Sequence, residues 1–300
     1  MNQVTDMLFS FINYLQHEKR VSPHTILAYQ KDLEQFQEFL ISNFGIDDIS
    51  IAGHADIRAW MIHLIELPLS TGSINRKIAT LRSYYKFLLR NGSIPKDPTY
   101  KIQALKKGKR LPTFVTEPTM EDILNEMRFG DHFEDQRDKI ILEILYLTGM
   151  RLSELIGLKW TEVDLYECQI KVNGKGNKNR IIPLSIGMKK NIVSYKKVFE
   201  ETFSIVNSSD YFIVRKSKEP AYPMMIYRVV RKNLDLFVKT SKRSPHVLRH
   251  TFATHLLNKG ADLNAVKDLL GHASLAATQV YTHNSIEKLK AVFEQAHPKA

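Results

Sequence analysis

Residues 244–255 read SPHVLRHTFATH, and their order predicts a helix that opens at a serine–proline pair. Ser244 is favourable just before a helix, and Pro245 suits the first helical position, where no amide hydrogen is needed. Four chemically capable side chains follow within this predicted helix: His246, Arg249, His250 and His255. The first three share one face, whereas the last points roughly opposite.

The residues of this helix favour an anion over a metal ion. Zinc sites combine neutral imidazoles with anionic ligands, and the permanent charge of Arg249 would repel a cation. The glutamate that lies between the two histidines of a metalloprotease helix is also missing. A phosphate instead fits a helix N-terminus beside the guanidinium of Arg249 and the imidazole of His246. For His250 and His255 we expect a structural role.

The bulk composition is that of an ordinary globular protein with an excess of positive charge. The 300 residues suggest two domains, and 43% hydrophobic with 25% charged residues is typical of soluble chains. We expect no membrane span, no signal peptide in MNQVTDMLFSF, and a reducing cytoplasm, because a lone Cys168 excludes a disulfide within the chain. We expect Cys168 to pack in the core. The net charge of +11 favours nucleic acid as the partner, although a solubility charge would look the same.

Residues 1–100 are predicted to form a helical domain. Apolar residues recur at helical spacing, and Ser22 with Pro23 marks the start of one helix. Two apolar stripes illustrate the spacing: Leu8, Phe11, Ile12 and Leu15, then Ile26, Tyr29, Leu33, Phe36 and Leu40. Basic residues line a later helix, 73–92, as either a solvated face or a DNA-facing one: Arg76, Lys77, Arg82, Lys86 and Arg90.

A basic linker and a second domain are predicted to follow. Residues 101–112, KIQALKKGKRLP, contain no acid and indicate an exposed, mobile tether suited to crossing a phosphate backbone. Residues 113–300 mix helices with a hairpin in ECQIKVNGKGNKNRIIPL, 167–184, and a short strand in YFIVR, 211–215. The predicted fold is therefore mainly α with a small β-sheet, the second domain being α+β.

Three further motifs carry chemistry that is weak when each is taken alone. In TGMRLSELIGL, Gly149 ends one helix and Arg151 opens the next, with Glu154 placed to orient the arginine, a pairing that is usually structural. NGKGNKNR puts Lys175 at a hairpin tip but lacks the pattern of a P-loop. LLGHASLAATQVYTH adds one histidine and one tyrosine: His272 and Tyr281.

The order of these motifs resembles the tyrosine recombinases, or phage integrase family, and most closely their bacterial XerC/XerD branch. The resemblance covers essentially the whole chain, and SPHTILAYQKDL, 22–33, is similar to the start of the family's helical, SAM-like core-binding domain. This sequence departs at Glu117–Pro118, at YPMMIYRVV and at Asn179. We expect these departures to affect DNA-sequence preference and not the chemistry.

The resemblance implies a catalytic set of six residues: Arg151, Lys175, His246, Arg249, His272 and Tyr281. Tyr281 would attack the phosphodiester and form a 3′-phosphotyrosyl link. Its ordinary pKa of about 10 requires cationic neighbours that favour the phenolate. The two arginines and His272 would bind the phosphate, and Lys175 would protonate the departing 5′ oxygen. His246 would assist proton transfer or bind the phosphate, and Glu154 would support Arg151.

The resemblance also implies partners and the absence of a cofactor. Exchanging a phosphodiester for a phosphotyrosyl ester needs no nucleotide or metal. Strand exchange would require a tetramer with a sister recombinase on double-stranded DNA, switched on by a translocase of the FtsK type. A C-terminal helix with Ile286, Leu289 and Phe293 would dock on a neighbouring subunit or on its own domain. Candidate DNA contacts are Arg76, Lys77, Arg82, Lys106, Lys107, Lys109 and Arg110.

Several functions remain open at this point. The favoured hypothesis is a Xer-type recombinase that resolves chromosome dimers at a dif-like site, and the alternative is an integrase of a mobile element. A relaxase resembling type IB topoisomerases shares the arginine–lysine–tyrosine chemistry, but the helical first domain argues against it. A DNA-binding protein without catalysis is disfavoured by the intact six-residue set.

Overall fold

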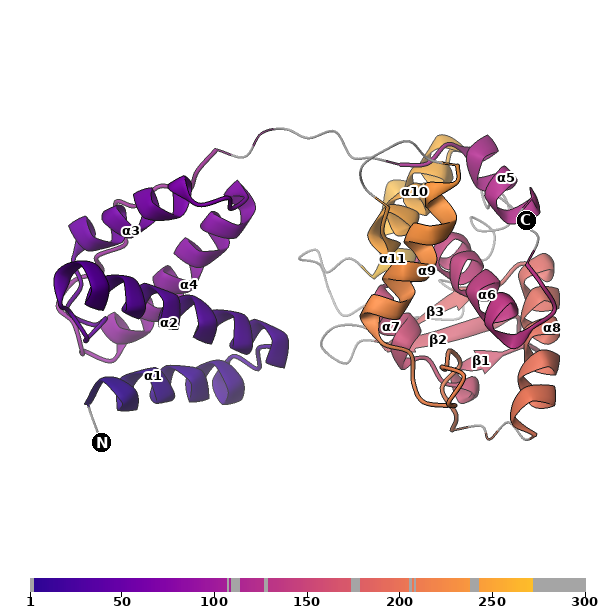
Figure 1. The fold of residues 1–300 in the computed structure, drawn as a ribbon, viewed down its shortest axis with the longest axis horizontal. Coiled ribbons are helices and arrows are strands. Elements are labelled where there is room, and N and C mark those ends of the chain that lie inside the picture. The colour runs from indigo at the N-terminus through magenta and orange to yellow at the C-terminus, as the bar shows by residue number, and fades with distance from the viewer. Residues whose placement is uncertain are drawn as a thin grey trace. The chain divides into compact units, whose positions relative to one another are not determined.

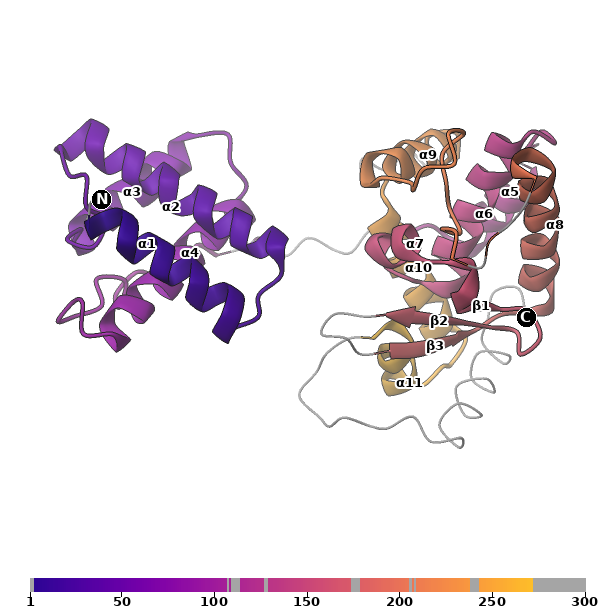
Figure 2. The same ribbon diagram turned by 90° about the horizontal axis from the view of Figure 1, so that it is seen from below.

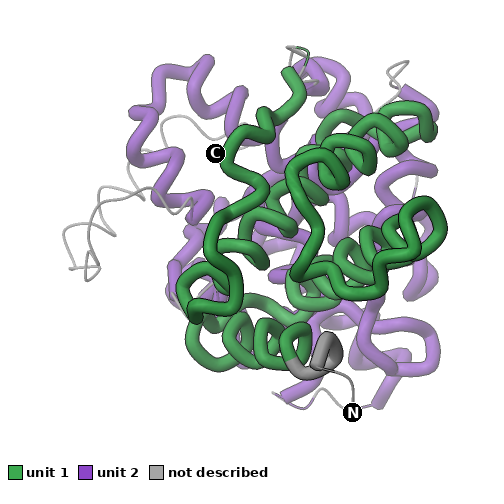
Figure 3. The backbone as a smooth tube through the Cα atoms, turned by 90° about the vertical axis from the view of Figure 1, so that its left-hand side faces the viewer, with its two compact units in different colours: residues 1–110 green, residues 111–300 purple. Residues whose placement is uncertain are grey.

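The chain is mainly helical with one small sheet, as predicted (Figures 1 and 2). The structure is a computed structural model that describes residues 3–106, 108, 114–126, 129–173, 179–204, 207, 209–237 and 243–271. The chain divides into two compact units, residues 1–110 and 111–300 (Figure 3). None of the helices in these described ranges is long and apolar enough to cross a membrane.

Unit 1 packs its helices around the predicted apolar stripes. Its elements are α1 (Gln3–Asn13), a π-helical turn (Tyr14–Glu18), α2 (Pro23–Phe44), α3 (His54–Glu66) and α4 (Thr71–Arg90). Ser22 caps α2 by accepting a hydrogen bond from the amide of Thr25, and Pro23 occupies the first helical position, as predicted. Phe11, Phe36 and Trp60 lie fully buried between the helices.

The first half of the predicted linker is part of unit 1. Ile102 is buried against the core, and Leu105 packs beside it. The side chain of Asn75 on α4 donates to the carbonyl of Leu105 and accepts from its amide, at 2.9 and 2.8 Å. The prediction of an exposed tether is therefore wrong for Ile102 and Leu105, although the lysines beside them, Lys101 and Lys106, are exposed. The two apolar residues among the lysines supply contacts that outweigh the charge.

Unit 2 surrounds the buried helix α6. Its helices are α5 (Glu117–Glu126), α6 (Phe133–Thr148), α7 (Leu152–Gly157), a 3₁₀ turn (Trp160–Glu162), α8 (Ile186–Phe203), α9 (Pro223–Asp235), α10 (Pro245–Asn258) and α11 (Leu263–Leu270). Every residue of α6 from Ile140 to Thr148 is buried. Helices α8, α9 and α10 pack around it (Figure 1). Helix α8 is an element that the sequence analysis missed.

The two strands of the predicted hairpin are part of a three-stranded sheet in the described residues, in the order β1-β2-β3. Strands β2 (Gln169–Asn173) and β3 (Asn179–Pro183) pair antiparallel with Ile170 opposite Ile182, and β1 (Val163–Asp164) adds to β2. Helix α11 lies beside β3 (Figure 2). Cys168, expected in the core, is partly buried and packs against it.

The strand predicted at 211–215 is not part of this sheet. Two isolated bridges, Lys159 with Tyr211 and Val214 with Pro220, replace it. The apolar residues of this stretch are nevertheless buried in the core: Phe212, Ile213 and Val214. Here a short apolar run correctly indicates burial but does not indicate pairing in the sheet.

Gly149 offers a test of how tightly α6, α10 and α11 meet. It ends α6 with φ of +59°, and a Cβ atom there would lie 2.4 Å from Cδ1 of Phe252 and 2.8 Å from Cδ2 of Leu270. We expect Gly149→Ala to lower the free energy of unfolding of unit 2 by about 3 kcal/mol, because left-handed strain adds to overpacking. Urea unfolding followed by Trp160 fluorescence in a Trp60→Phe background isolates unit 2.

Gly260 provides the matched control for this substitution. Its φ of +86° is also left-handed, but a Cβ atom there would meet nothing within 4 Å. Gly260→Ala should therefore cost only the backbone strain, about 1 kcal/mol. Equal losses for the two variants would show that the contact of Gly149 with Phe252 and Leu270 is not tight.

Candidate active site

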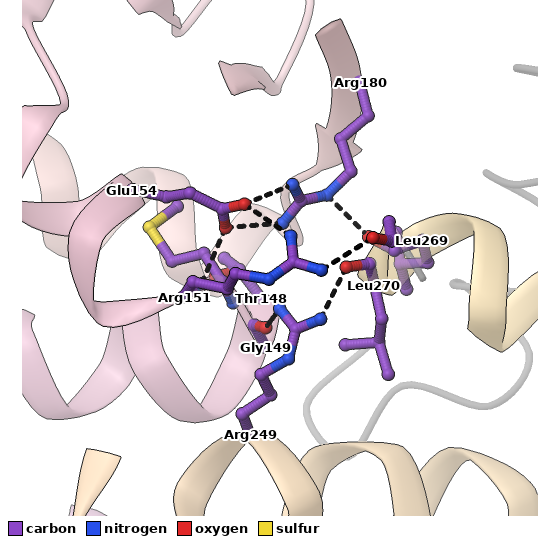
Figure 4. A network of polar contacts seen from close by, with 10 residues as sticks. Thr148, Gly149, Arg151, Glu154, Arg180, Arg249, Leu269 and Leu270 are labelled. Atoms are coloured by element: carbon purple, nitrogen blue, oxygen red, sulfur yellow. Dashed lines mark hydrogen bonds and ion pairs between the residues drawn. The ribbon is translucent and has the colours of Figure 1, made fainter. Parts of the chain in front are cut away.

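Three arginines from distant parts of unit 2 meet at the C-terminal end of α11 (Figure 4). Arg151 immediately precedes α7, Arg180 lies on β3 and Arg249 lies on α10. Each donates to a different one of three consecutive carbonyl groups. Arg180 Nε bonds Leu269 O at 2.9 Å, Arg249 Nη2 bonds Leu270 O at 2.5 Å, and Arg151 Nη2 bonds Gly271 O at 2.6 Å.

Local sequence explains why the arginines gather there. The last carbonyls of a helix lack partners within the helix and lie at the negative end of its dipole, so they attract cationic donors. Gly271 ends α11 with φ of +63°, and Gly149 ends α6 in the same left-handed conformation. The turn at Gly149 directs the chain into Arg151, and the Gly149 carbonyl accepts a 2.6 Å hydrogen bond from Arg249 Nη1.

Glu154 joins two of the arginines. Its Oε1 accepts from Nη1 of Arg151 at 2.8 Å and from Nη1 of Arg180 at 2.7 Å. Its Oε2 accepts from the amide of Arg151 at 2.6 Å and from Nη2 of Arg180 at 2.8 Å. Burial acts to raise the pKa of Glu154, but Arg180 and Arg151 outweigh it and lower the pKa to about 2. The carboxylate is therefore charged, and its contact with Arg151 agrees with the sequence-based expectation.

Arg249 is the more enclosed of the two arginines singled out from the sequence. It is 6% exposed, whereas the side chain of Arg151 is 33% exposed. Burial lowers the pKa of Arg249 to about 10, and the charge of Arg151 acts in the same direction. The guanidinium stays protonated at neutral pH. The cluster thus contains three guanidinium groups and one carboxylate, which is bonded to Arg151 and Arg180, and the excess of positive charge suits an anionic ligand.

Of the remaining catalytic residues predicted from the sequence, the structure describes His246. His246 is exposed in the first turn of α10, and His250 is half-buried on the same helix. Ser244 occupies the position before α10, but its side chain makes no capping hydrogen bond. Lys175, His272, Tyr281 and the helix predicted around Ile286, Leu289 and Phe293 lie outside the described residues.

His255 has the structural role expected from the sequence. Its Nε2 hydrogen-bonds the carbonyl of Val115 at 2.9 Å, and its Nδ1 hydrogen-bonds the hydroxyl of Tyr146 at 3.0 Å. The amide of Val115 in turn donates to Oγ1 of Thr251. These bonds fasten the beginning of unit 2 to α10. Among the described residues, no group of three His, Cys, Asp or Glu side chains is placed to hold a metal ion.

His255 makes the stability of unit 2 depend on pH. Burial lowers its pKa below the ordinary value of 6.5, although Glu117 acts in the opposite direction. The unfolded chain therefore binds this proton more readily, and the free energy of unfolding should fall as the pH drops below about 6.5. The slope should reach at most about 1.4 kcal/mol per pH unit. The slope is measured from the urea midpoints of unit 2 between about pH 7.5 and 5.5. The His255→Gln variant should show a smaller slope. An unchanged slope in this variant would show that His255 does not cause the pH dependence.

The candidate DNA contacts in unit 1 need one correction. Lys77 is only 6% exposed, and its Nζ lies 3.1 Å from Oδ1 of Asp32 in an ion pair with a buried carboxylate. It is therefore a core residue, because its ammonium group is enclosed and paired inside the protein and does not face solvent. Arg76 is half-exposed and also contacts Asp32, Arg82 donates to the carbonyl of Ile102, and Lys106 is exposed. Lys107, Lys109 and Arg110 lie outside the described residues.

Arg180 is the residue of this cluster that the sequence analysis missed. Arg180 and Ile182 lie two residues apart on β3, and both side chains are buried on the same face of the strand. Alternation along a strand places residues i and i+2 on the same face. An arginine at an inward-facing strand position indicates a buried acidic partner, and this signal was available in the sequence.

Comparison with known proteins gives consistent matches along both units. The model of the phage integrase family matches residues 113–288, and the model of the phage integrase N-terminal SAM-like domain matches residues 8–92. Tyrosine recombinase XerC of Chlorobaculum parvum is 37% identical, covering 97% of this chain and 94% of the relative. Tyrosine recombinase XerC of Bacillus subtilis is 36% identical, covering 100% and 99%.

Solved structures share the fold. XerH site-specific recombinase bound to palindromic difH substrate, a post-cleavage complex, aligns with a TM-score of 0.72 at 20% identity, covering 96% of this chain and 88% of that chain. A lambda integrase dimer bound to a COC′ core site aligns with a TM-score of 0.66 at 18% identity, covering 92% and 99%.

The two family matches, the two-unit fold and the arginine cluster define the class of the protein: the chain belongs to the phage integrase family. It is a tyrosine recombinase of the Xer type, as its XerC relatives indicate.

Proposed function

We propose that this enzyme cuts and rejoins DNA at a specific site through a 3′-phosphotyrosyl intermediate. The phenolic oxygen of Tyr281 attacks the scissile phosphorus, and the bond from phosphorus to the 5′ oxygen breaks. Lys175 donates a proton to that 5′ oxygen, and His246 receives the proton of the tyrosine. Attack of a 5′ hydroxyl from a second duplex reverses these steps and joins the exchanged strand.

The arginine cluster is the observation that carries this proposal. Arg151 and Arg249 would bind the non-bridging oxygens, with His272 as a third donor and Glu154 holding Arg151 in place. Each guanidinium has five N–H groups, more than the two that each arginine gives to nearby oxygen acceptors, so donors remain for a phosphate. Their positive charge would stabilise the negative charge that develops on the phosphorane and would favour the phenolate of Tyr281.

We further propose the chromosomal duty of a Xer recombinase, which is resolution of chromosome dimers at a dif-like site in the cytoplasm. XerC relatives of 34–38% identity that cover almost the whole chain support this duty over that of a mobile-element integrase. The assembly would be a tetramer with a sister recombinase on double-stranded DNA, activated by a translocase of the FtsK type. No cofactor is required. Candidate DNA contacts from unit 1 and the linker are Arg76, Arg82, Lys106, Lys107, Lys109 and Arg110.

Covalent capture on genomic DNA tests the proposal. The protein is incubated with fragmented DNA of its own host, denatured, and the DNA ends attached to it are sequenced. We expect recurrent ends at one site, called below the captured site, with the protein on the 3′ phosphate. Absence of denaturant-stable complexes, or attachment through a 5′ phosphate, would refute the proposed chemistry.

A relaxation assay separates recombinase from topoisomerase. Supercoiled plasmids with and without the captured site are incubated with the protein, and their topology is followed on gels. We expect efficient reaction only of the plasmid that carries the site. Equal relaxation of both plasmids would assign the protein to the type IB topoisomerase-like alternative.

A further inference from the structure

We propose that Arg180 is a positioning residue of this active site: it neutralises Glu154 and holds the end of α11, so that Arg151 keeps its positive charge for the scissile phosphate. The proposal rests on the proposed function, because it takes Arg151 as a ligand of that phosphate. It assigns a task to a residue that the proposed reaction steps do not use.

Enclosure distinguishes Arg180 from Arg151. The side chain of Arg180 is 4% exposed, and its Nη1, Nη2 and Nε atoms all donate to groups of the protein. The side chain of Arg151 is 33% exposed. Arg180 therefore faces Glu154 and Leu269 inside the protein, whereas part of the Arg151 side chain is open to a DNA phosphate. Figure 4 shows the carboxylate of Glu154 facing the guanidinium groups of both Arg180 and Arg151.

The charges give Arg180 its task. Glu154 carries a full negative charge beside Arg151, and this carboxylate would offset the attraction of Arg151 for a phosphate if it had no other partner. Arg180 binds both carboxylate oxygens in the parallel, two-bond geometry that is strongest for arginine. The neutral pair of Arg180 and Glu154 can then fix the position of Arg151 without cancelling its charge.

Besides binding Glu154, which contacts Arg151, Arg180 connects two further segments that carry predicted catalytic residues, those of Lys175 and His272. It lies on β3, five residues after Lys175 in the chain. Its Nε holds the carbonyl of Leu269 at 2.9 Å, three residues before His272. A Cβ atom on Gly271 would lie 3.3 Å from Cδ and Nη1 of Arg180, so the arginine packs closely against the end of α11.

The test compares two DNA substrates that differ in the charge at the scissile position. One is a nicked duplex with the captured site, and the other carries an uncharged methylphosphonate in place of the scissile phosphate. Rates of covalent attachment are measured at saturating DNA for wild type, Arg180→Met, Arg180→Lys and the double variant Arg180→Met/Glu154→Gln. Arg137→Met is the matched control, because Arg137 is also buried in unit 2 but pairs with Asp138 on α6.

Arg180→Met is expected to slow attachment to the phosphodiester by roughly tenfold to a hundredfold, with little change in the Kd for DNA. The loss should be much smaller on the methylphosphonate, because a neutral centre depends less on the charge of Arg151. The double variant should regain most of the rate, since the neutral amide that replaces the carboxylate of Glu154 has no charge to offset Arg151. Arg180→Lys should fall between wild type and Arg180→Met, because lysine keeps the charge but not the two-bond geometry.

Two results would overturn the proposal: equal slowing of Arg180→Met on both substrates without recovery in the double variant, or no slowing at all. If Arg180→Met fails to fold by circular dichroism and Trp160 fluorescence, the double variant decides, because it leaves no unpaired buried charge. A folded double variant within about tenfold of the wild-type rate supports the proposal, and one slowed by roughly a hundredfold or more refutes it. A wild-type protein that attaches to no DNA refutes the proposed function instead.

Discussion

The Tyr281→Phe protein is expected to bind the captured site and to form no covalent complex with it. Phenylalanine keeps the ring of tyrosine but lacks the oxygen that would bond to phosphorus. DNA binding should persist because the cations that attract the phosphate backbone are unchanged. The measurement uses a nicked suicide duplex, in which the cleaved fragment diffuses away, and counts protein that migrates with DNA in a denaturing gel.

Tyr166 provides the matched control for this substitution. It is 90% exposed in unit 2, so Tyr166→Phe removes one phenolic hydroxyl from the same unit without disturbing the core. We expect Tyr166→Phe to be trapped as efficiently as wild type. Trapping of Tyr281→Phe would show that another residue is the nucleophile. Loss of DNA binding would instead show that the substitution disturbs the fold.

Arg249→Met is expected to slow covalent attachment by roughly a hundredfold to a thousandfold at saturating DNA, about 3–4 kcal/mol of transition-state stabilisation. Two effects act together. The phosphate loses a fixed positive charge, and the carbonyls of Gly149 and Leu270 lose the guanidinium that joins them. Arg249→Lys keeps the charge but cannot span both carbonyls, so we expect it to be clearly slower than wild type.

An exposed arginine controls for the loss of one charge from the whole protein. Arg231 on α9 has a side chain that is 74% exposed, and Arg231→Met lowers the net charge by the same amount. This control should attach to DNA at close to the wild-type rate. A wild-type rate for Arg249→Met, with its fold confirmed by circular dichroism, would remove Arg249 from the catalytic set.

Local signals in the sequence predicted much of the secondary structure. Ser22 with Pro23, Gly149, and the alternation on both sides of residues 174–178 each marked an element that the structure contains. The errors came where packing overrides local pattern. The run at 211–215 has the composition of a strand but forms only isolated bridges. Ile102, at the start of the predicted basic linker, is buried in the core of unit 1.

The candidate site shows the same division. Arg151 with Glu154 and Arg249 were recognisable because each lies in a short motif whose residues are neighbours on one helix or turn. Lys77 was wrongly predicted to contact DNA because the sequence does not show that Asp32, 45 residues away, lies beside it in the core. For Arg180 the strand alternation indicated burial, but the sequence does not show that its acidic partner is Glu154, 26 residues away on another element.

The sequence by itself determined the chemical groups available to this enzyme, the helix ends that carry them and the family to which the order of motifs belongs. Each helix end and each motif depends on residues within a few positions of one another, and the order of the motifs can be read along the chain without any tertiary contact. The tertiary structure alone decided that Arg151, Arg180 and Arg249 meet at three consecutive carbonyls at the end of α11, and that Arg151 and Arg180 share the carboxylate of Glu154. That meeting joins residues up to 120 positions apart, and only the packing of α6, α10, α11 and the sheet around one core brings them within hydrogen-bonding distance.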